Sequence, residues 1–179
     1  MATHFLAGSL IFLFFAKYFG IEINGWYLLA GCFWGIFPDP LSYLLSKTAT
    51  TNKWAHKHRD NFSHSIFLPI LVFIALALFN PQLAMMVGAV TLTHPLLDLI
   101  GMGWGVTLFY PFSDKVFKLF YNGKLLTIWT PEEVDAEAEK FGNDNWIKDI
   151  FFTFFTLDPV SLSEKASLIS TITLVIYYW

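Results

Sequence analysis

Five apolar segments, separated by polar connections, constrain the fold of this chain more than any other feature. They cover residues 5–18, 25–37, 66–79, 83–100 and 166–179. Hydrophobic residues make up 55% of the sequence and charged residues only 14%, whereas about a quarter of the residues in a soluble domain are charged. Mean hydropathy is +0.53. The composition therefore predicts an integral membrane protein.

Most of these segments are shorter than the roughly 20 residues that span a hydrocarbon core. Turn-forming residues at 20–25 and at Asn80-Pro81 separate the first pair and the middle pair, so each pair is expected to form an antiparallel helical hairpin. We predict an all-α, polytopic helical membrane bundle of short helices with a metal site at one membrane face. Residues 1–179 are expected to form one domain, with a helical core (1–112), a polar and interfacial region (113–165) and a C-terminal apolar helix (166–179).

Charge distribution predicts the orientation. The connection at 45–65 carries Lys47, Lys53, Lys57 and Arg59, whereas the two hairpin turns hold almost no positive charge. Because positively charged loops stay in the cytoplasm, this connection is expected to be cytoplasmic. The net charge of -3 and the lack of a strongly basic stretch argue against a nucleic-acid partner. The single Cys32 excludes a disulfide within the chain.

Histidine and aspartate residues fall where apolar segments meet connections. If the first four segments cross the bilayer in alternating directions, these residues reach the same, cytoplasmic face. Imidazole and carboxylate are ligands that zinc prefers. We therefore predict one site for one or two divalent ions, most simply zinc. Its expected ligands are His4, Asp39, His64, His94 and Asp98.

Each of these residues also has a structural interpretation. His94 and Asp98 are four residues apart and share one face of a helix, where they could hold an ion or form a polar pair. Pro95 disfavours helix at His94 and could start a fresh turn there. Asp39, between two prolines, suits a turn that ends a helix. A lone N-terminal His4 has only its position in its favour.

Arg59 stands between His58 and His64 on the basic connection. Its guanidinium matches a phosphate or a carboxylate through two hydrogen bonds. Ser63 or Ser65 could instead serve to cap the next helix. His56 is interpreted as a solvated loop residue and not as a ligand.

The chain after Gly101 differs in character. Asn122-Gly123 fits either a hairpin turn or the stop after a short helix. Thr130-Pro131 with Glu133 forms a capping box, which predicts a helix from Pro131 to about Phe141. Residues 146–157 suit a helix at the lipid interface.

The order of these residues resembles the YdjM-like family of membrane-bound metal-dependent hydrolases. The resemblance covers about the first two thirds of the chain. It rests on the following elements: His4, Pro38-Asp39, His58-Arg59-x-x-x-x-His64-Ser65, His94-x-x-x-Asp98 and Tyr110-Pro111-Phe112-Ser113. More faintly, the order of His4, Asp39, His64 and the His94–Asp98 pair is similar to zinc-dependent phospholipase C and P1-type nucleases. No histidine follows His94, so their later ligands have no counterpart.

The resemblance implies a metal-dependent hydrolase of the inner membrane whose substrate is a lipid-linked or small-molecule phosphoester. A bound ion lowers the pKa of water toward about 7 and so supplies hydroxide. The candidate catalytic residues are Asp39, as a bridging ligand or base, Arg59, as a charge stabiliser, and His58. Two alternatives remain: a membrane protein that binds or handles ions without catalysis, and a structural membrane protein. The sequence does not predict an oligomeric state.

Overall fold

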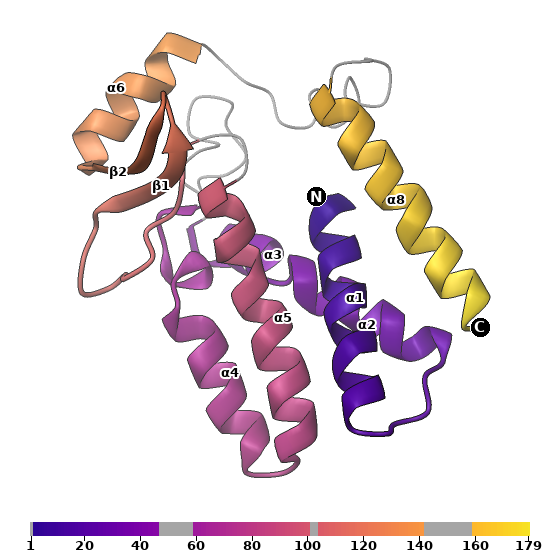
Figure 1. The fold of residues 1–179 in the computed structure, drawn as a ribbon. Coiled ribbons are helices and arrows are strands. Elements are labelled where there is room, and N and C mark those ends of the chain that lie inside the picture. The colour runs from indigo at the N-terminus through magenta and orange to yellow at the C-terminus, as the bar shows by residue number, and fades with distance from the viewer. Residues whose placement is uncertain (1, 47–58, 101–103, 142–158) are drawn as a thin grey trace. The chain divides into compact units, whose positions relative to one another are not determined.

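The computed structural model describes residues 2–46, 59–100, 104–141 and 159–179, and within them the protein is mostly helical (Figure 1). Packing divides the chain into two compact units. Unit 1 comprises Met1–Phe37, Pro69–His94 and Phe152–Trp179, and unit 2 comprises Pro38–Leu68 and Pro95–Phe151. The prediction of a single domain stays a prediction.

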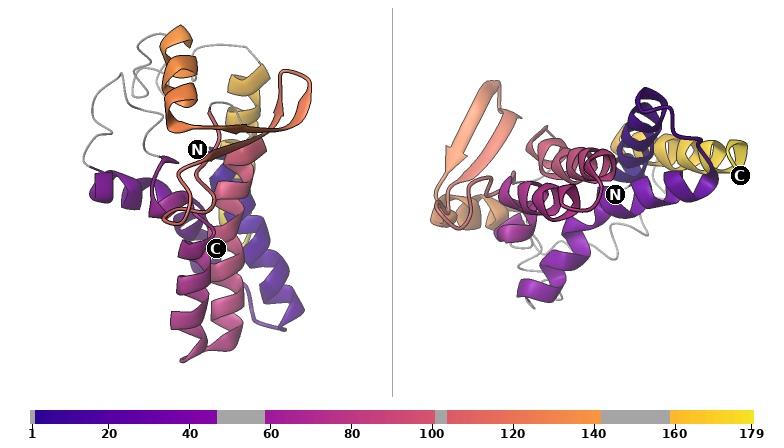
Figure 2. Two further views of the ribbon diagram at one scale, coloured as in Figure 1. Left: turned by 90° about the vertical axis from the view of Figure 1, so that its left-hand side faces the viewer. Right: turned by 90° about the horizontal axis from the view of Figure 1, so that it is seen from below.

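Unit 1 is helical throughout its described part. Its helices are α1 (Ala2–Tyr18), α2 (Gly25–Ile36), most of α4 (Phe67–Ala77), α5 (Pro81–Ile100) as far as His94, and α8 (Pro159–Tyr177). Both expected turns are present: Asn24 accepts a hydrogen bond from the Tyr27 amide, and Asn80 accepts one from the Leu83 amide. These side chains satisfy amides at the start of α2 and α5. α4 and α5 lie side by side in both views of Figure 2.

Glycines bring the backbones of α1 and α2 into contact. A Cβ atom on Gly8 would lie 2.1 Å from the carbonyl oxygen of Gly31, and one on Gly35 would lie 2.5 Å from the carbonyl oxygen of His4. Only glycine fits at such distances. Close packing through small residues is typical of helix pairs in membranes.

On α8 of unit 1, large apolar side chains face outward while small and polar ones face inward. On α8 the buried residues are Ser161, Ser167 and Thr171. The exposed large side chains of this helix include Leu162, Ile169, Ile172 and Ile176. A protein surrounded by water shows the opposite pattern. This arrangement is suited to contact with lipid.

One described helix, α5, is long and apolar enough to cross a membrane alone. A second candidate arises if α2 and α3 (Pro38–Ser46), which meet at a bend, count as one broken span. α1 and α4 are apolar but shorter. The 17 residues of α1 extend about 25 Å at 1.5 Å per residue, less than a hydrocarbon core of about 30 Å.

Unit 2 corrects the prediction of an all-α fold. It contains an antiparallel hairpin of β1 (Val116–Tyr121) and β2 (Lys124–Trp129) in addition to α3, the 3-10 helix η2 (Phe62–His64) and α6 (Pro131–Phe141). Asn122 and Gly123 form its turn with φ angles of 47° and 76°. Positive φ at both central residues matches the twist of a tight hairpin, so the Asn-Gly pair marks a turn and not a helix stop.

Three local predictions can be compared with the structure directly. The capping box is confirmed: Glu133 accepts a hydrogen bond from the Thr130 amide at 2.8 Å, and Thr130 accepts one from the Glu133 amide at 3.4 Å. Pro95 does not restart the chain, because α5 continues through it to Ile100. Asp39 lies in the first turn of α3 and not in a helix-ending turn. The predicted interfacial helix at 146–157 lies outside the described residues.

Candidate metal centre

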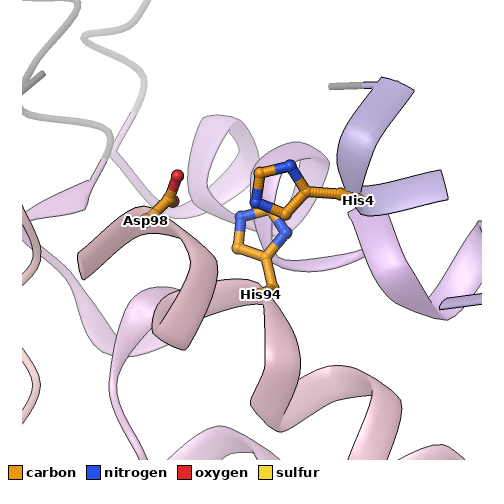
Figure 3. Close-up of side chains that lie close together, drawn as sticks. All are labelled: His4, His94 and Asp98. Atoms are coloured by element: carbon orange, nitrogen blue, oxygen red, sulfur yellow. The ribbon is translucent and has the colours of Figure 1, made fainter. Parts of the chain in front are cut away.

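His94 belongs to unit 1 and is held by the helix packing described above. The residue is only 1% exposed. Its Nδ1 lies 2.7 Å from the carbonyl oxygen of Gly35, which packs against His4 of α1. The rings of His4 and His94 lie against each other with centroids 4.3 Å apart. Figure 3 shows this pair, with Asp98 one turn further along α5.

The hydrogen bond to Gly35 determines the protonation pattern of His94. A carbonyl oxygen only accepts, so Nδ1 carries the proton and donates it. The neutral ring therefore presents a lone pair at Nε2. An Nδ1–H bonded to a backbone carbonyl is the usual arrangement in histidines that bind metal through Nε2.

In unit 2 the buried histidine of the candidate centre is His64. It is fully buried on η2, and its Nε2 faces two buried carboxylates. The distances are 3.3 Å to Oδ1 of Asp39 and 3.6 Å to Oδ2 of Asp98. Ligands bound at about 2.0 to 2.2 Å around a tetrahedral ion lie about 3.4 Å from one another. Each carboxylate oxygen thus lies about as far from Nε2 of His64 as a second ligand of the same ion would.

A chain of polar side chains fixes the ring of His64. The Ser63 hydroxyl donates to Oδ1 of Asn61 at 2.7 Å and lies 2.9 Å from Nδ1 of His64. Because its single proton is used on Asn61, this hydroxyl accepts the Nδ1 proton of His64. Asn61 is held in turn by a 2.6 Å hydrogen bond from its Nδ2 to Ser42 of α3. Nε2 of His64 is therefore also the nitrogen directed toward the carboxylates.

Two cations from separate segments contact Asp98. Nη2 of Arg59 lies 3.0 Å from Oδ1 of Asp98, and Nζ of Lys118 on β1 lies 3.4 Å from its carbonyl oxygen. Lys118 is only 4% exposed. Burial, followed by the charge of Arg59, lowers the pKa of Lys118 to about 8, and Asp98 opposes the shift.

The structure thus brings together Asp39, His64, Asp98 and Arg59 within unit 2, and His4 and His94 within unit 1. Buried histidines and aspartates of this kind could hold a metal ion. His58 lies outside the described residues, so its catalytic role stays a prediction. Ser65 accepts a hydrogen bond from the Phe67 amide at the start of α4, as expected of a cap.

Sequence reasoning missed Lys118 and the supporting roles of Asn61 and Gly35. A single lysine inside the apolar run 116–120 was an available signal, since a lysine in such a run needs a partner when it is buried. The spacing of Gly31 and Gly35 by four residues was another, because small residues one turn apart indicate close helix packing.

Exposed apolar side chains on the helices of unit 1, together with the buried imidazoles and carboxylates of each unit, define a membrane protein with a candidate metal centre. The model of the YdjM inner membrane protein family matches residues 1–177, and the chain belongs to this family. The resemblance drawn from the histidine and aspartate motifs is thereby confirmed. Comparison with curated proteins and with solved structures found no match, so the similarity to phospholipase C and P1-type nucleases stays a prediction.

Proposed function

We propose that the protein is a polytopic inner-membrane hydrolase that uses one or two divalent ions, with zinc the first choice, to cleave phosphoesters. Its ligands are His4, Asp39, His64, His94 and Asp98. The observation that carries the proposal is the position of Nε2 of His64, whose lone pair faces carboxylate oxygens at 3.3 and 3.6 Å. An imidazole lone pair with carboxylate oxygens beside it is a set of ligands that a divalent ion such as zinc prefers.

A proton on Nε2 of His64 would also account for these two distances. It would leave unexplained why His94 directs a lone pair away from Gly35 with the ring of His4 beside it. His94 and Asp98 are four residues apart on the continuous helix α5, the spacing of two ligands on one helix face.

The residues of the chain then have separate tasks. A divalent ion, when bound, supplies a nucleophile at neutral pH by lowering the pKa of water toward about 7. Asp39 is placed to bridge ions or to accept a proton. Arg59 holds Asp98 at 3.0 Å and can bind the negative charge that develops on a phosphoryl oxygen.

Exposed apolar side chains support the membrane location of unit 1, including those of α4 and α8. Basic residues of the 45–65 connection support a cytoplasmic position for the ends of the helices that carry the ligands. Short helices such as α1 cross by drawing on flanking residues or by local thinning of the bilayer.

Metal analysis of detergent-purified protein tests the centre. We expect bound zinc or manganese in the wild type and its loss in His94→Ala, because a ligand is removed. His56→Ala, a histidine outside the ligand set, should keep wild-type metal. Arg59→Ala should keep metal but lower turnover of phosphoesters by about 10²- to 10³-fold, the loss typical of removing one oxyanion donor. Wild-type protein without metal would refute the centre, and metal without turnover of any phosphoester tested would favour the ion-handling alternative.

A further inference from the structure

The burial of Lys118 is not explained by its hydrogen bond to α5 alone. Its contact with the carbonyl oxygen of Asp98, in the last turn of the helix, resembles an ordinary C-terminal cap. A capping lysine normally keeps its ammonium group in water. Here the side chain is 4% exposed, and a second cation, Arg59, contacts the same residue, Asp98. Burying an ammonium group is unfavourable unless anions compensate it, so capping alone does not account for the position of Lys118.

Backbone contacts hold the two cations in a fixed relation. The hydroxyl of Thr107 donates to the carbonyl oxygen of Arg59 at 2.9 Å. The preceding residue, Val106, pairs with Phe117 through hydrogen bonds of 3.0 and 2.9 Å. Gly105 permits this approach, because a Cβ atom there would lie 2.1 Å from the carbonyl oxygen of Phe117. One short segment thus positions Arg59 and the strand of Lys118 together.

The charges of unit 2 indicate what these cations bind. Its buried carboxylates, Asp39 and Asp98, balance Arg59 and Lys118. A divalent ion on the carboxylates would add two positive charges to this set of two anions and two cations. Excess charge in a buried site is costly. Hydroxide offsets one charge and a phosphodiester also one, whereas a phosphomonoester carries about two negative charges at neutral pH.

We propose that Arg59 and Lys118 together bind the dianion of a phosphomonoester beside Asp98. This assignment rests on the proposed metal centre and narrows its substrate from phosphoesters in general to monoesters. The shared chemistry is a terminal phosphate, whether it belongs to a soluble metabolite or to a lipid such as phosphatidate. Arg59 supplies a planar pair of donors and Lys118 a compact charge, which suits a tetrahedral group with several oxygens.

Calorimetric titration of manganese-loaded protein with inorganic phosphate tests the assignment. Lys118→Met should weaken phosphate binding at least tenfold with bound manganese unchanged, and Lys118→Arg should retain most of the affinity. Lys115 is an exposed lysine directly before β1, and Lys115→Met should bind phosphate as tightly as the wild type. A Lys118→Met protein that binds phosphate as tightly as the wild type would overturn the proposal and leave Lys118 a helix cap.

A comparison on the wild type needs no variant to fold. Phosphate should bind at least tenfold more tightly than dimethyl phosphate, a monoanion; equal affinity would overturn the assignment. If glycerol 3-phosphate competes with phosphate, the ligand is a soluble monoester. If only phosphatidate in nanodiscs competes, the ligand is a lipid. If neither competes, the assignment is also overturned. Protein that binds no manganese refutes the metal centre itself, and protein that binds manganese but no phosphate refutes only the present inference.

Discussion

At the scale of single residues, hydrogen bonds to Nδ1 decide what each imidazole can do. His94 gives this proton to Gly35 and His64 gives it to Ser63, so both rings keep Nε2 for another partner. The donors and acceptors involved are neither charged nor exposed. They act by fixing the ring orientation and the tautomer.

Ser63→Ala should therefore weaken metal binding by 10- to 100-fold, because His64 loses the acceptor that fixes its tautomer. Competition for zinc with a chromophoric chelator measures the change. Ser65→Ala is the matched control, since the Ser65 hydroxyl donates to the carbonyl oxygen of Phe62 and accepts from the Phe67 amide instead of bonding the ring of His64. Equal zinc affinity in Ser63→Ala and the wild type would show that the tautomer of His64 is irrelevant.

The candidate ligands could be picked out from sequence because histidine and aspartate recur at the ends of apolar segments. The residues that hold these side chains in place could not be predicted. Asn61, Ser63 and Ser42 form a chain only because η2 packs against α3, and neither local pattern nor spacing specifies that contact. Lys118 acquires its partner through the hairpin, whose turn residues Asn122-Gly123 were compatible with two structures.

At the scale of elements, the α1–α2 contact links helix packing to ligand placement. Gly35 serves twice: its missing side chain admits the backbone of His4, and its carbonyl oxygen accepts the proton of His94. The apolar segments gave good predictions of where the helices lie, since burial depends on hydrophobicity. They did not predict which faces meet, because that depends on small residues whose hydrophobicity is unremarkable.

Gly35→Ala should separate α1 from α2 and displace both histidines, because its Cβ would meet the His4 carbonyl oxygen at 2.5 Å. Overpacking of this kind costs about 1–3 kcal/mol. We expect a lower midpoint of thermal unfolding in detergent and reduced zinc binding. Leu29→Ala, at an exposed position on the same helix, should change neither markedly. A Gly35→Ala protein with wild-type stability would contradict the close backbone contact.

At the scale of the whole molecule, the surrounding membrane determines which side chains are favourable at the protein surface. α8 buries serine and threonine and exposes isoleucine, a pattern that lipid makes favourable. Among the described helices, only α5 is both long and apolar enough to span by itself. The number of crossings is therefore a question of topology that helix length alone does not answer.

Cysteine-accessibility labelling in intact cells and inverted vesicles tests that topology. Cysteine placed at Asn52 should react from the cytoplasmic side, because its connection is basic, and cysteine at Gln82 should react from the opposite side. The Cys32→Ala background removes the single native thiol. Labelling of both positions from one side would show that residues 66–79 do not cross the membrane.

Chain order gives the glycine contact of α1 and α2 a role in biosynthesis. These two helices precede α5 in the chain, so their backbones can pack together before α5 has been synthesised. His94 follows Gly35 by 59 residues, so the nascent protein presents His4 on a finished hairpin well before its partner imidazole exists. If the proposed centre holds an ion, its capture by both imidazoles must wait until α5 joins this hairpin, so metal loading would report the arrival of α5.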